Sequence, residues 1–212
     1  MQKSIIKKKS ISFFRLNVLF KFIKVIQKKT NIRLYIIIAF LSFFYSTNLI
    51  VDFGNINGKN KDWILISDNV MGGVSKSKLE YLDDSFLLTG NISLDNYGGF
   101  SSIKTKYENF DLTDYKGVKI RFKSSKQKFA FTLEESRNWT SPNFKGDFNS
   151  TKENTWEVIT IYFKDFKEYQ IGEPTGNKLK TSSLKNIVRL GIITTDKKEG
   201  PFTIEVDYIE FF

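Results

Sequence analysis

Short runs of alternating apolar and polar residues fill most of the chain after about residue 50. Period-two runs of four to eight residues, bounded by turn residues, predict half-buried β-strands. No apolar stripe with helical spacing is longer than two turns, and only Ser182–Ile187 predicts a short helical turn. The strand-like runs are 85–94, 117–122, 128–133, 155–163, 186–194 and 201–212.

Many short strands at regular spacing predict an all-β fold, an antiparallel β-sandwich of jelly-roll type. Val51-Asp52-Phe53 is expected to form the first strand and to pair with the C-terminal strand, which closes such a fold. Aromatic residues make up 16% of the chain and include 21 Phe, which suits a β-rich core. Trp156, in an apolar run, is expected in that core.

The first fifty residues differ from the rest in charge and hydropathy. They hold ten of the 33 basic residues and no acidic ones. We divide the chain into a basic extension at 1–33, a signal-peptide core or membrane anchor at 34–49, and a β-sandwich domain at 50–212. The leader is expected to engage a membrane or the export machinery. The predicted location is exported or anchored on the periplasmic side of a bacterial inner membrane, with the mitochondrion as the alternative.

The domain itself carries 23 basic and 23 acidic residues, so it lacks the basic face that nucleic-acid binding needs. Without Cys and His, thiol and histidine catalysis and zinc-thiolate sites are excluded. Glu134/Glu135 point to opposite faces of a strand, and Glu205/Asp207 have a spacing common on solvated edges. We therefore expect no enzyme and no cofactor. Calcium suits loop carboxylates, but no spacing selects a site for it.

Two similar stretches stand out, DNVMGGVS at 68–75 and DNYGGFS at 95–101. A phosphate-binding loop would lead into a helix through Lys-Ser/Thr, whereas both stretches lead into alternating, strand-like sequence. Glycine pairs serve tight turns, and Asp-Asn can cap such turns by Asx hydrogen bonding. The ordinary explanation is therefore two tight turns at one end of the sandwich, each capped by its own Asp-Asn.

The segment WILISDNVMGGVS, Trp63 to Ser75, resembles the hallmark of the complex I intermediate-associated protein 30 family. NYGGFSS at 96–102, the DL and YKG steps at 111–117 and the LGI strand at 190–192 follow in the same order. The resemblance covers about residues 50–212. It implies a galactose-binding-like β-sandwich, similar to carbohydrate-binding modules, and an assembly factor for respiratory complex I that acts through protein contacts. The family often has an Arg-Gly step where this chain reads PTGN at 174–177.

The resemblance makes the two glycine stretches the best candidate binding loops, to which exposed aromatic residues would add anchors. A glycan is the alternative partner, bound by Trp139, Tyr97, Asn96 and Asp68. Trp139 lies in a loop-like sequence, and Phe144 and Phe148 are expected at the same surface. The candidate binding residues are Asp68, Asn69, Met71, Gly72, Gly73, Ser75, Asn96, Tyr97, Gly98, Gly99, Trp139 and Phe144.

Overall fold

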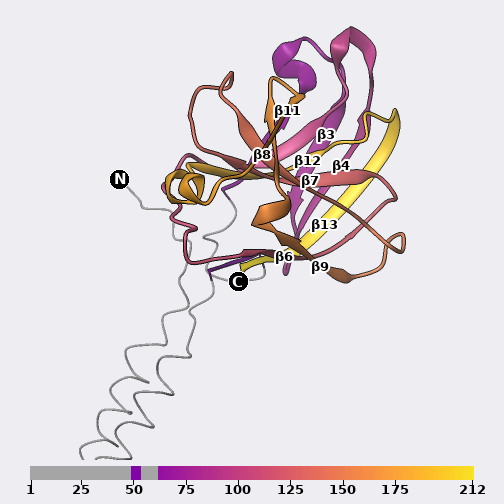
Figure 1. Cartoon of the computed structure of the whole chain (residues 1–212). Helices are drawn as coiled ribbons and strands as arrows, with labels where there is room; N and C mark the ends of the chain where they lie inside the picture. The colour runs from indigo at the N-terminus through magenta and orange to yellow at the C-terminus, as the bar shows by residue number, and fades with distance from the viewer. Residues whose placement is uncertain (1–48, 54–61) are drawn as a thin grey trace, which may run out of the picture.

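The computed structural model describes residues 49–53 and 62–212 (Figure 1). The leader predicted over 1–33 and 34–49 lies outside the described residues except for Leu49. Within the described ranges, no helix is long and apolar enough to cross a membrane.

The first of two antiparallel sheets is built around the C-terminal strand, β13 (Gly200–Phe211). The order in this sheet is β3-β4-β13-β6-β9, and β1 pairs with the last part of β13. Its other strands are β1 (Ile50–Asp52), β3 (Lys76–Tyr81), β4 (Phe86–Ile92), β6 (Gly117–Ser124) and β9 (Glu157–Tyr162).

The second sheet has seven strands in the order β11-β10-β8-β7-β12-β5-β2. All its pairings are antiparallel. Its strands are β2 (Ile64–Ser67), β5 (Ser101–Lys104), β7 (Lys128–Glu134), β8 (Asn143–Asn149), β10 (Lys167–Gln170), β11 (Glu173–Lys178) and β12 (Arg189–Thr194).

The two sheets face each other, and the chain crosses between them repeatedly, which confirms the predicted antiparallel β-sandwich (Figure 1). The pairing of β1 with β13 confirms the expected contact between the first and last strands. The predicted turn near 182–187 is a 3-10 turn, η4 (Thr181–Asn186). The jelly-roll subtype stays a prediction.

Aromatic rings from both sheets fill the space between them. Phe122 of β6 meets Phe148 of β8 edge-on, with ring centroids 5.1 Å apart, and Phe148 stacks on Phe129 of β7. Phe131 of β7 lies against Phe211 of β13. These rings alternate with outward-facing residues along each strand, as the sequence pattern predicts. Burying them supplies most of the stabilising free energy of the domain.

The structure departs from the sequence-based prediction at two places. The strands β2, β8, β10 and β11 were not predicted, although Phe144 and Phe148 show the period-two spacing of an inward face. Trp156, predicted in the core, is half-buried on the outside of the first sheet. There Arg121 and Lys123 lie 4.7 and 4.9 Å from its ring centroid. β9 is an edge strand with one solvated face, so its second apolar face is not covered.

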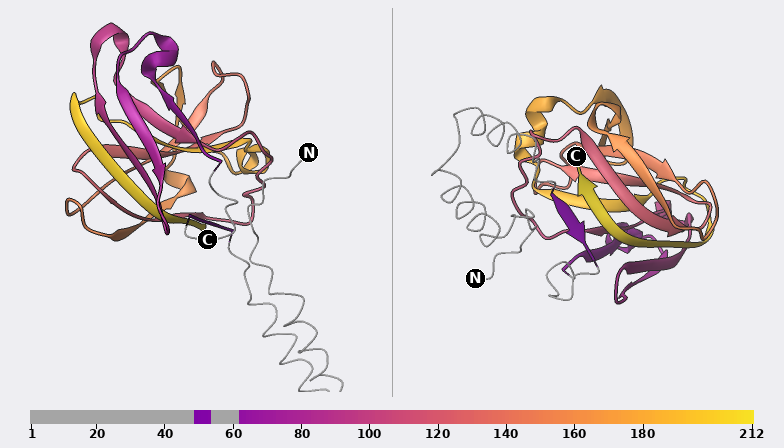
Figure 2. Two further views of the ribbon diagram at one scale, coloured as in Figure 1. Left: turned by 180° about the vertical axis from the view of Figure 1, so that it is seen from behind. Right: turned by 90° about the horizontal axis from the view of Figure 1, so that it is seen from below.

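The two glycine stretches lie at one end of the molecule, and the described chain begins at the other. Gly200 at the start of β13 pairs with Ile92, next to the second glycine stretch. Leu49 accepts a hydrogen bond from Phe211 at the far end of β13. Twelve extended residues separate these ends by roughly 40 Å. Figure 2 shows the same arrangement from behind, with the indigo and pink loops far from the C-terminus.

Candidate functional site

The two glycine stretches begin with short 3-10 turns, η1 (Asp68–Met71) and η2 (Asp95–Tyr97). The first leads into β3 and the second into β5, which confirms that neither opens a helix of the kind that binds phosphate. Gly72 ends η1 in the left-handed conformation, with φ of +91°, and Gly99 has φ of +120°. Both positions require the conformational freedom of glycine.

The Asp68 side chain joins the two stretches. It is 1% exposed, and its Oδ2 accepts hydrogen bonds from the Gly99 N–H at 2.7 Å and the Phe100 N–H at 3.3 Å. The same carboxylate accepts from the Ser75 N–H at 3.1 Å and the Ser75 hydroxyl at 2.5 Å. One carboxylate therefore satisfies three backbone donors from two loops that lie about 30 residues apart in sequence.

Two glycines make room for this carboxylate. A Cβ added at Gly73 would lie 2.5 Å from Cγ of Asp68. A Cβ at Gly98 would lie 2.7 Å from its Oδ2 and 2.9 Å from the carbonyl oxygens of Asp95 and Ser93. All of these distances are too short for a non-bonded contact. The two glycines are therefore needed for close packing and not only for turning the chain.

Ser75 extends the connection to the end of β4. Its hydroxyl donates to Asp68 and accepts from the Ser93 N–H at 3.0 Å. Ser75 is also buried, with 1% of its surface exposed. Asp68, Ser75 and the two close-packed glycines thus form one internal cluster, which we call the aspartate cluster (Asp68, Gly73, Ser75, Gly98).

The hydrogen bonds of this cluster keep Asp68 ionised. Burial alone would raise its pKa, but the bonds from Ser75, Gly99 and Phe100 together outweigh burial and hold the pKa below the ordinary aspartate value. A carboxylate whose acceptor sites are used inside the fold is poorly placed to bind a ligand. Asp68 therefore positions the loops, and it does not supply the sugar contact considered from the sequence.

The expectation that each Asp-Asn pair caps its own turn is wrong, because no side-chain hydrogen bond caps η1 or η2. Asp68 bonds to Ser75 at the end of its own stretch and reaches across to Gly99 of the second stretch. Asp95, in the matching position, is exposed, and only its backbone carbonyl bonds back to Gly98. The repeated sequence motif therefore forms two different local structures, because the other loop encloses Asp68 but not Asp95.

Around the buried cluster, the same loops expose large apolar side chains. Val70 is 71% exposed, Met71 60% and Tyr97 fully exposed. Exposed apolar side chains that gather on one surface are typical of protein contact sites. We call this surface the loop patch, and its members are Val70, Met71, Val74, Leu94 and Tyr97.

Tyr97 is held in an unfavourable backbone conformation. Asn96 and Tyr97 have φ of +54° and +60°, in the left-handed region that asparagine tolerates and tyrosine disfavours. Such residues cost about 1 kcal/mol or more each and concentrate at functional sites. The Tyr97 ring is fully exposed, so packing of the ring does not offset this backbone cost.

The remaining aromatic candidates do not join the loop patch. Phe144 is 3% exposed and points into the core from β8, and Phe148 is equally buried, so the expectation that they are surface contacts is wrong. Trp139 is 71% exposed in the β7–β8 connection, as predicted. That connection follows Glu134, whereas the glycine stretches adjoin the Lys128 end of β7, roughly 20 Å away along the strand.

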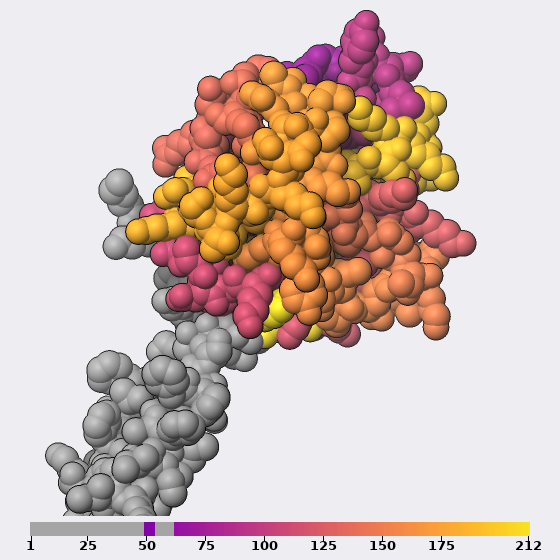
Figure 3. Space-filling model, in the orientation of Figure 1, coloured from indigo at the N-terminus to yellow at the C-terminus, as the bar shows by residue number. Residues whose placement is uncertain are grey.

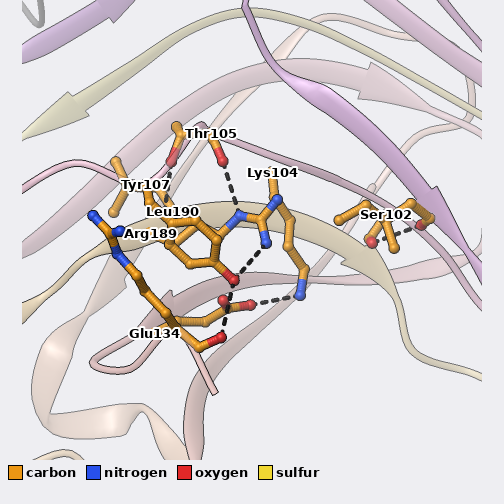
Figure 4. Close-up of polar contacts among 9 residues, drawn as sticks. Ser102, Lys104, Thr105, Tyr107, Glu134, Arg189 and Leu190 are labelled. Atoms are coloured by element: carbon orange, nitrogen blue, oxygen red, sulfur yellow. Dashed lines mark hydrogen bonds and ion pairs between the residues drawn. The ribbon is translucent and has the colours of Figure 1, made fainter. Parts of the chain in front are cut away.

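The outer face of the second sheet lies between these two ends. Figure 3 shows the β10–β11 hairpin in orange beside the salmon β7–β8 connection, with the purple and pink loop atoms at the upper right. Figure 4 shows polar side chains on this face: Lys104 binds Glu134 at 2.5 Å, and Arg189 donates to Thr105 and Tyr107. Sequence reasoning missed these residues, because their contacts arise only when distant strands pair.

The carboxylates of the described residues form no cluster that would bind a metal ion. Three of the four carboxylates considered from the sequence form ion pairs: Glu134 with Lys104, Glu205 with Lys123 and Asp207 with Arg121.

Comparison with solved structures places the fold among carbohydrate-binding modules. The family 11 carbohydrate-binding module of the cellulase Lic26A-Cel5E of Clostridium thermocellum aligns with a TM-score of 0.52 and 18% identity, over 70% of this chain and 86% of that one. The same module in complex with a mixed-linked tetrasaccharide gives 0.51 and 18%, over 71% and 88%. At this identity the likeness concerns the fold. A comparison with curated proteins gave no match.

The sequence model of one family matches residues 51–206, which is most of the chain and nearly the whole β-sandwich. The matched range contains both glycine stretches, the aspartate cluster and the loop patch. The chain therefore belongs to the complex I intermediate-associated protein 30 family.

Proposed function

We propose that this protein is a non-catalytic binding module that contacts a protein partner through the loop patch. The observation that carries the proposal is a contrast within the two joined glycine stretches, where Asp68 and Gly73 are buried and Met71 and Tyr97 are exposed. The buried part fixes the loops, so the exposed part is presented without loss of conformational entropy on binding. Family membership supports a subunit or assembly intermediate of NADH:ubiquinone oxidoreductase as that partner.

The position of the patch supports the same proposal. It lies roughly 40 Å from Leu49, the point where the leader joins the domain. If the leader anchors the chain on the periplasmic side of a bacterial inner membrane, the patch faces away from the attachment point and stays free. Protease treatment of spheroplasts checks this location, because a domain on the periplasmic side is digested before the cells are lysed.

The proposal is tested by placing a photo-crosslinking amino acid at position 97 or 71 of the full-length chain in its native membrane. We expect crosslinks to a subunit of NADH:ubiquinone oxidoreductase. The matched control carries the crosslinker at Val158, which is 51% exposed on the outer face of the other sheet. Equal crosslinking from position 158 would contradict a specific docking role for the loop patch.

A paired substitution gives the size of the effect. Tyr97→Asn with Met71→Ser should weaken partner binding by about 2 kcal/mol or more, since exposed Tyr anchors are common hot spots. Stability should change by less than about 1 kcal/mol, because neither side chain is packed and asparagine tolerates the left-handed backbone. Calorimetry checks both statements. Titration of the crosslinked subunit with the purified variant gives the affinity, and thermal unfolding of the variant gives the stability. Unchanged affinity would refute the anchor role.

Glycan binding is the second candidate, and Trp139 is the observation that favours it. Its ring is 71% exposed in the β7–β8 connection, and flat exposed aromatics stack on sugar rings. The mixed-linked tetrasaccharide is a direct probe. Binding that is lost in Trp139→Ala, together with an absence of crosslinks from positions 71 and 97, would replace the protein-partner proposal with this one.

A further inference from the structure

The outer face of the second sheet carries an ordered row of lysines. The pairing register places Lys104 of β5, Gly191 of β12, Thr132 of β7, Lys145 of β8 and Lys167 of β10 directly beside one another. Lys178 of β11 continues the row beside Lys167. Directly paired residues point to the same face, and adjacent strands lie about 4.8 Å apart. The lysine row (Lys104, Lys145, Lys167, Lys178) therefore crosses six strands.

The centre of the row is closely packed. Thr132 is 4% exposed. A Cβ at Gly191 would lie 2.6 Å from the Thr132 hydroxyl and 3.0 Å from Cγ of Lys104. The stem of Lys104 thus lies close to the sheet, and Lys104 and Lys145 are half-buried, whereas Lys167 and Lys178 are exposed.

Among the described residues, Lys145 in the middle of the row has no ion pair, and neither has the exposed Lys178 at its end. Lys104 pairs with Glu134 at 2.5 Å and Lys167 with Asp147 at 3.7 Å. Among the described residues, no carboxylate lies within 4.0 Å of the Lys145 ammonium, whose one recorded side-chain partner is the Tyr169 ring, 4.4 Å from Nζ to the centroid. A half-buried charge with no ion pair is unfavourable in the free protein.

The pKa of Lys145 is lowered, as expected for a half-buried ammonium group without an ion pair. Burial is the main cause that lowers its pKa, and Lys104 and Lys197 lower it further. Asp147 and Glu173 act in the opposite direction but do not restore the ordinary value. An anion placed beside Lys145 would remove this penalty, so the site is more favourable when occupied than when empty.

We propose that the lysine row is a second contact surface, which binds an acidic segment of the protein partner and receives one of its carboxylates at Lys145. This inference rests on the proposed function, because it assigns the chemistry of the partner. Carboxylates already pair with Lys104 and Lys167, and the carboxylate of the partner would take the position at Lys145 between them. The domain as a whole carries no excess charge, so the attraction is local to this row.

The test uses the full-length chain and hexaglutamate as the probe, followed by NMR of the lysine side-chain signals. Hexaglutamate should shift the Cε signal of Lys145 and leave Lys164 unchanged. Lys164 is the matched control, because its ammonium also lies over a tyrosine ring, 5.3 Å from the centroid of Tyr162. Lys145→Met should weaken hexaglutamate binding roughly tenfold, and binding should fall as salt rises.

Three outcomes would overturn the proposal: equal shifts with hexaglutamine, equal affinity in Lys145→Met, or shifts caused by inorganic phosphate at a concentration where hexaglutamate has no effect. Lys145→Met should fold at least as stably as the original chain, because the sulfur keeps contact with Tyr169 and the buried charge is gone. Hexaglutamate binding without crosslinks from position 97 would contradict only the proposal that the loop patch contacts a protein partner. Crosslinks without hexaglutamate binding would sink the lysine-row proposal alone.

Discussion

Replacing Asp68 by alanine should lower the free energy of unfolding by about 3–4 kcal/mol. The substitution leaves the backbone donors of Ser75, Gly99 and Phe100 without an acceptor in a buried place, and each such loss costs roughly 1 kcal/mol or more. Urea denaturation followed by circular dichroism measures the change. Asp95→Ala, in the matching but exposed position, is the control and should cost less than about 0.5 kcal/mol. Similar costs at the two positions would contradict the aspartate cluster.

The same carboxylate predicts a dependence on pH. Because the folded-state pKa of Asp68 is lowered, its contribution is fully present above the unfolded pKa, near 3.8. The contribution is lost as the pH falls from that value through the lower folded-state pKa. The stability of the original chain should therefore fall more steeply than that of Asp68→Ala in acid. Parallel stability curves below pH 4 would show that Asp68 is not held ionised by the fold.

Alanine at Gly73 or Gly98 should destabilise the domain by roughly 3 kcal/mol, although neither residue has a positive φ. The cost comes from contact, since the added methyl group would overlap the Asp68 side chain in both cases. Gly72→Ala is the matched control, because its destabilisation would come from backbone strain and not from contact. Nothing lies within 4 Å of an added Cβ there, but φ is +91°, so about 1 kcal/mol of backbone strain is expected. Denaturation of the three variants under one set of conditions compares them.

Combining each glycine substitution with Asp68→Ala shows whether its destabilisation comes from contact with the Asp68 side chain. The three atoms nearest to an added Cβ at Gly73 all belong to the Asp68 side chain. Asp68→Ala removes two of them, so Gly73→Ala should cost less in that background. At Gly98 two of the nearest atoms are backbone oxygens, which stay in place, and the cost should persist. Additive effects at Gly73 would mean that Asp68 does not set the need for glycine there.

Period-two patterning predicted most strands from sequence because each strand has one buried face. It identified β4, β6, β7, β9, β12 and β13 and the pairing of the first and last strands. It missed β8, because Gly146 interrupts the apolar alternation between Phe144 and Phe148. It also placed Trp156 in the core, because alternation defines two faces of a strand but not whether both are covered.

Some features of the candidate site depend on local sequence, and others depend on the tertiary structure. The sequence by itself identified the two glycine stretches, excluded a phosphate loop and predicted exposure of Trp139, because these depend on local residue chemistry. Only the tertiary structure decided that Asp68 bonds to Gly99, that Phe144 is buried and that Lys145 stands in a row of lysines. Those contacts join residues tens of positions apart, and strand register and sheet order bring them together, which no local pattern specifies.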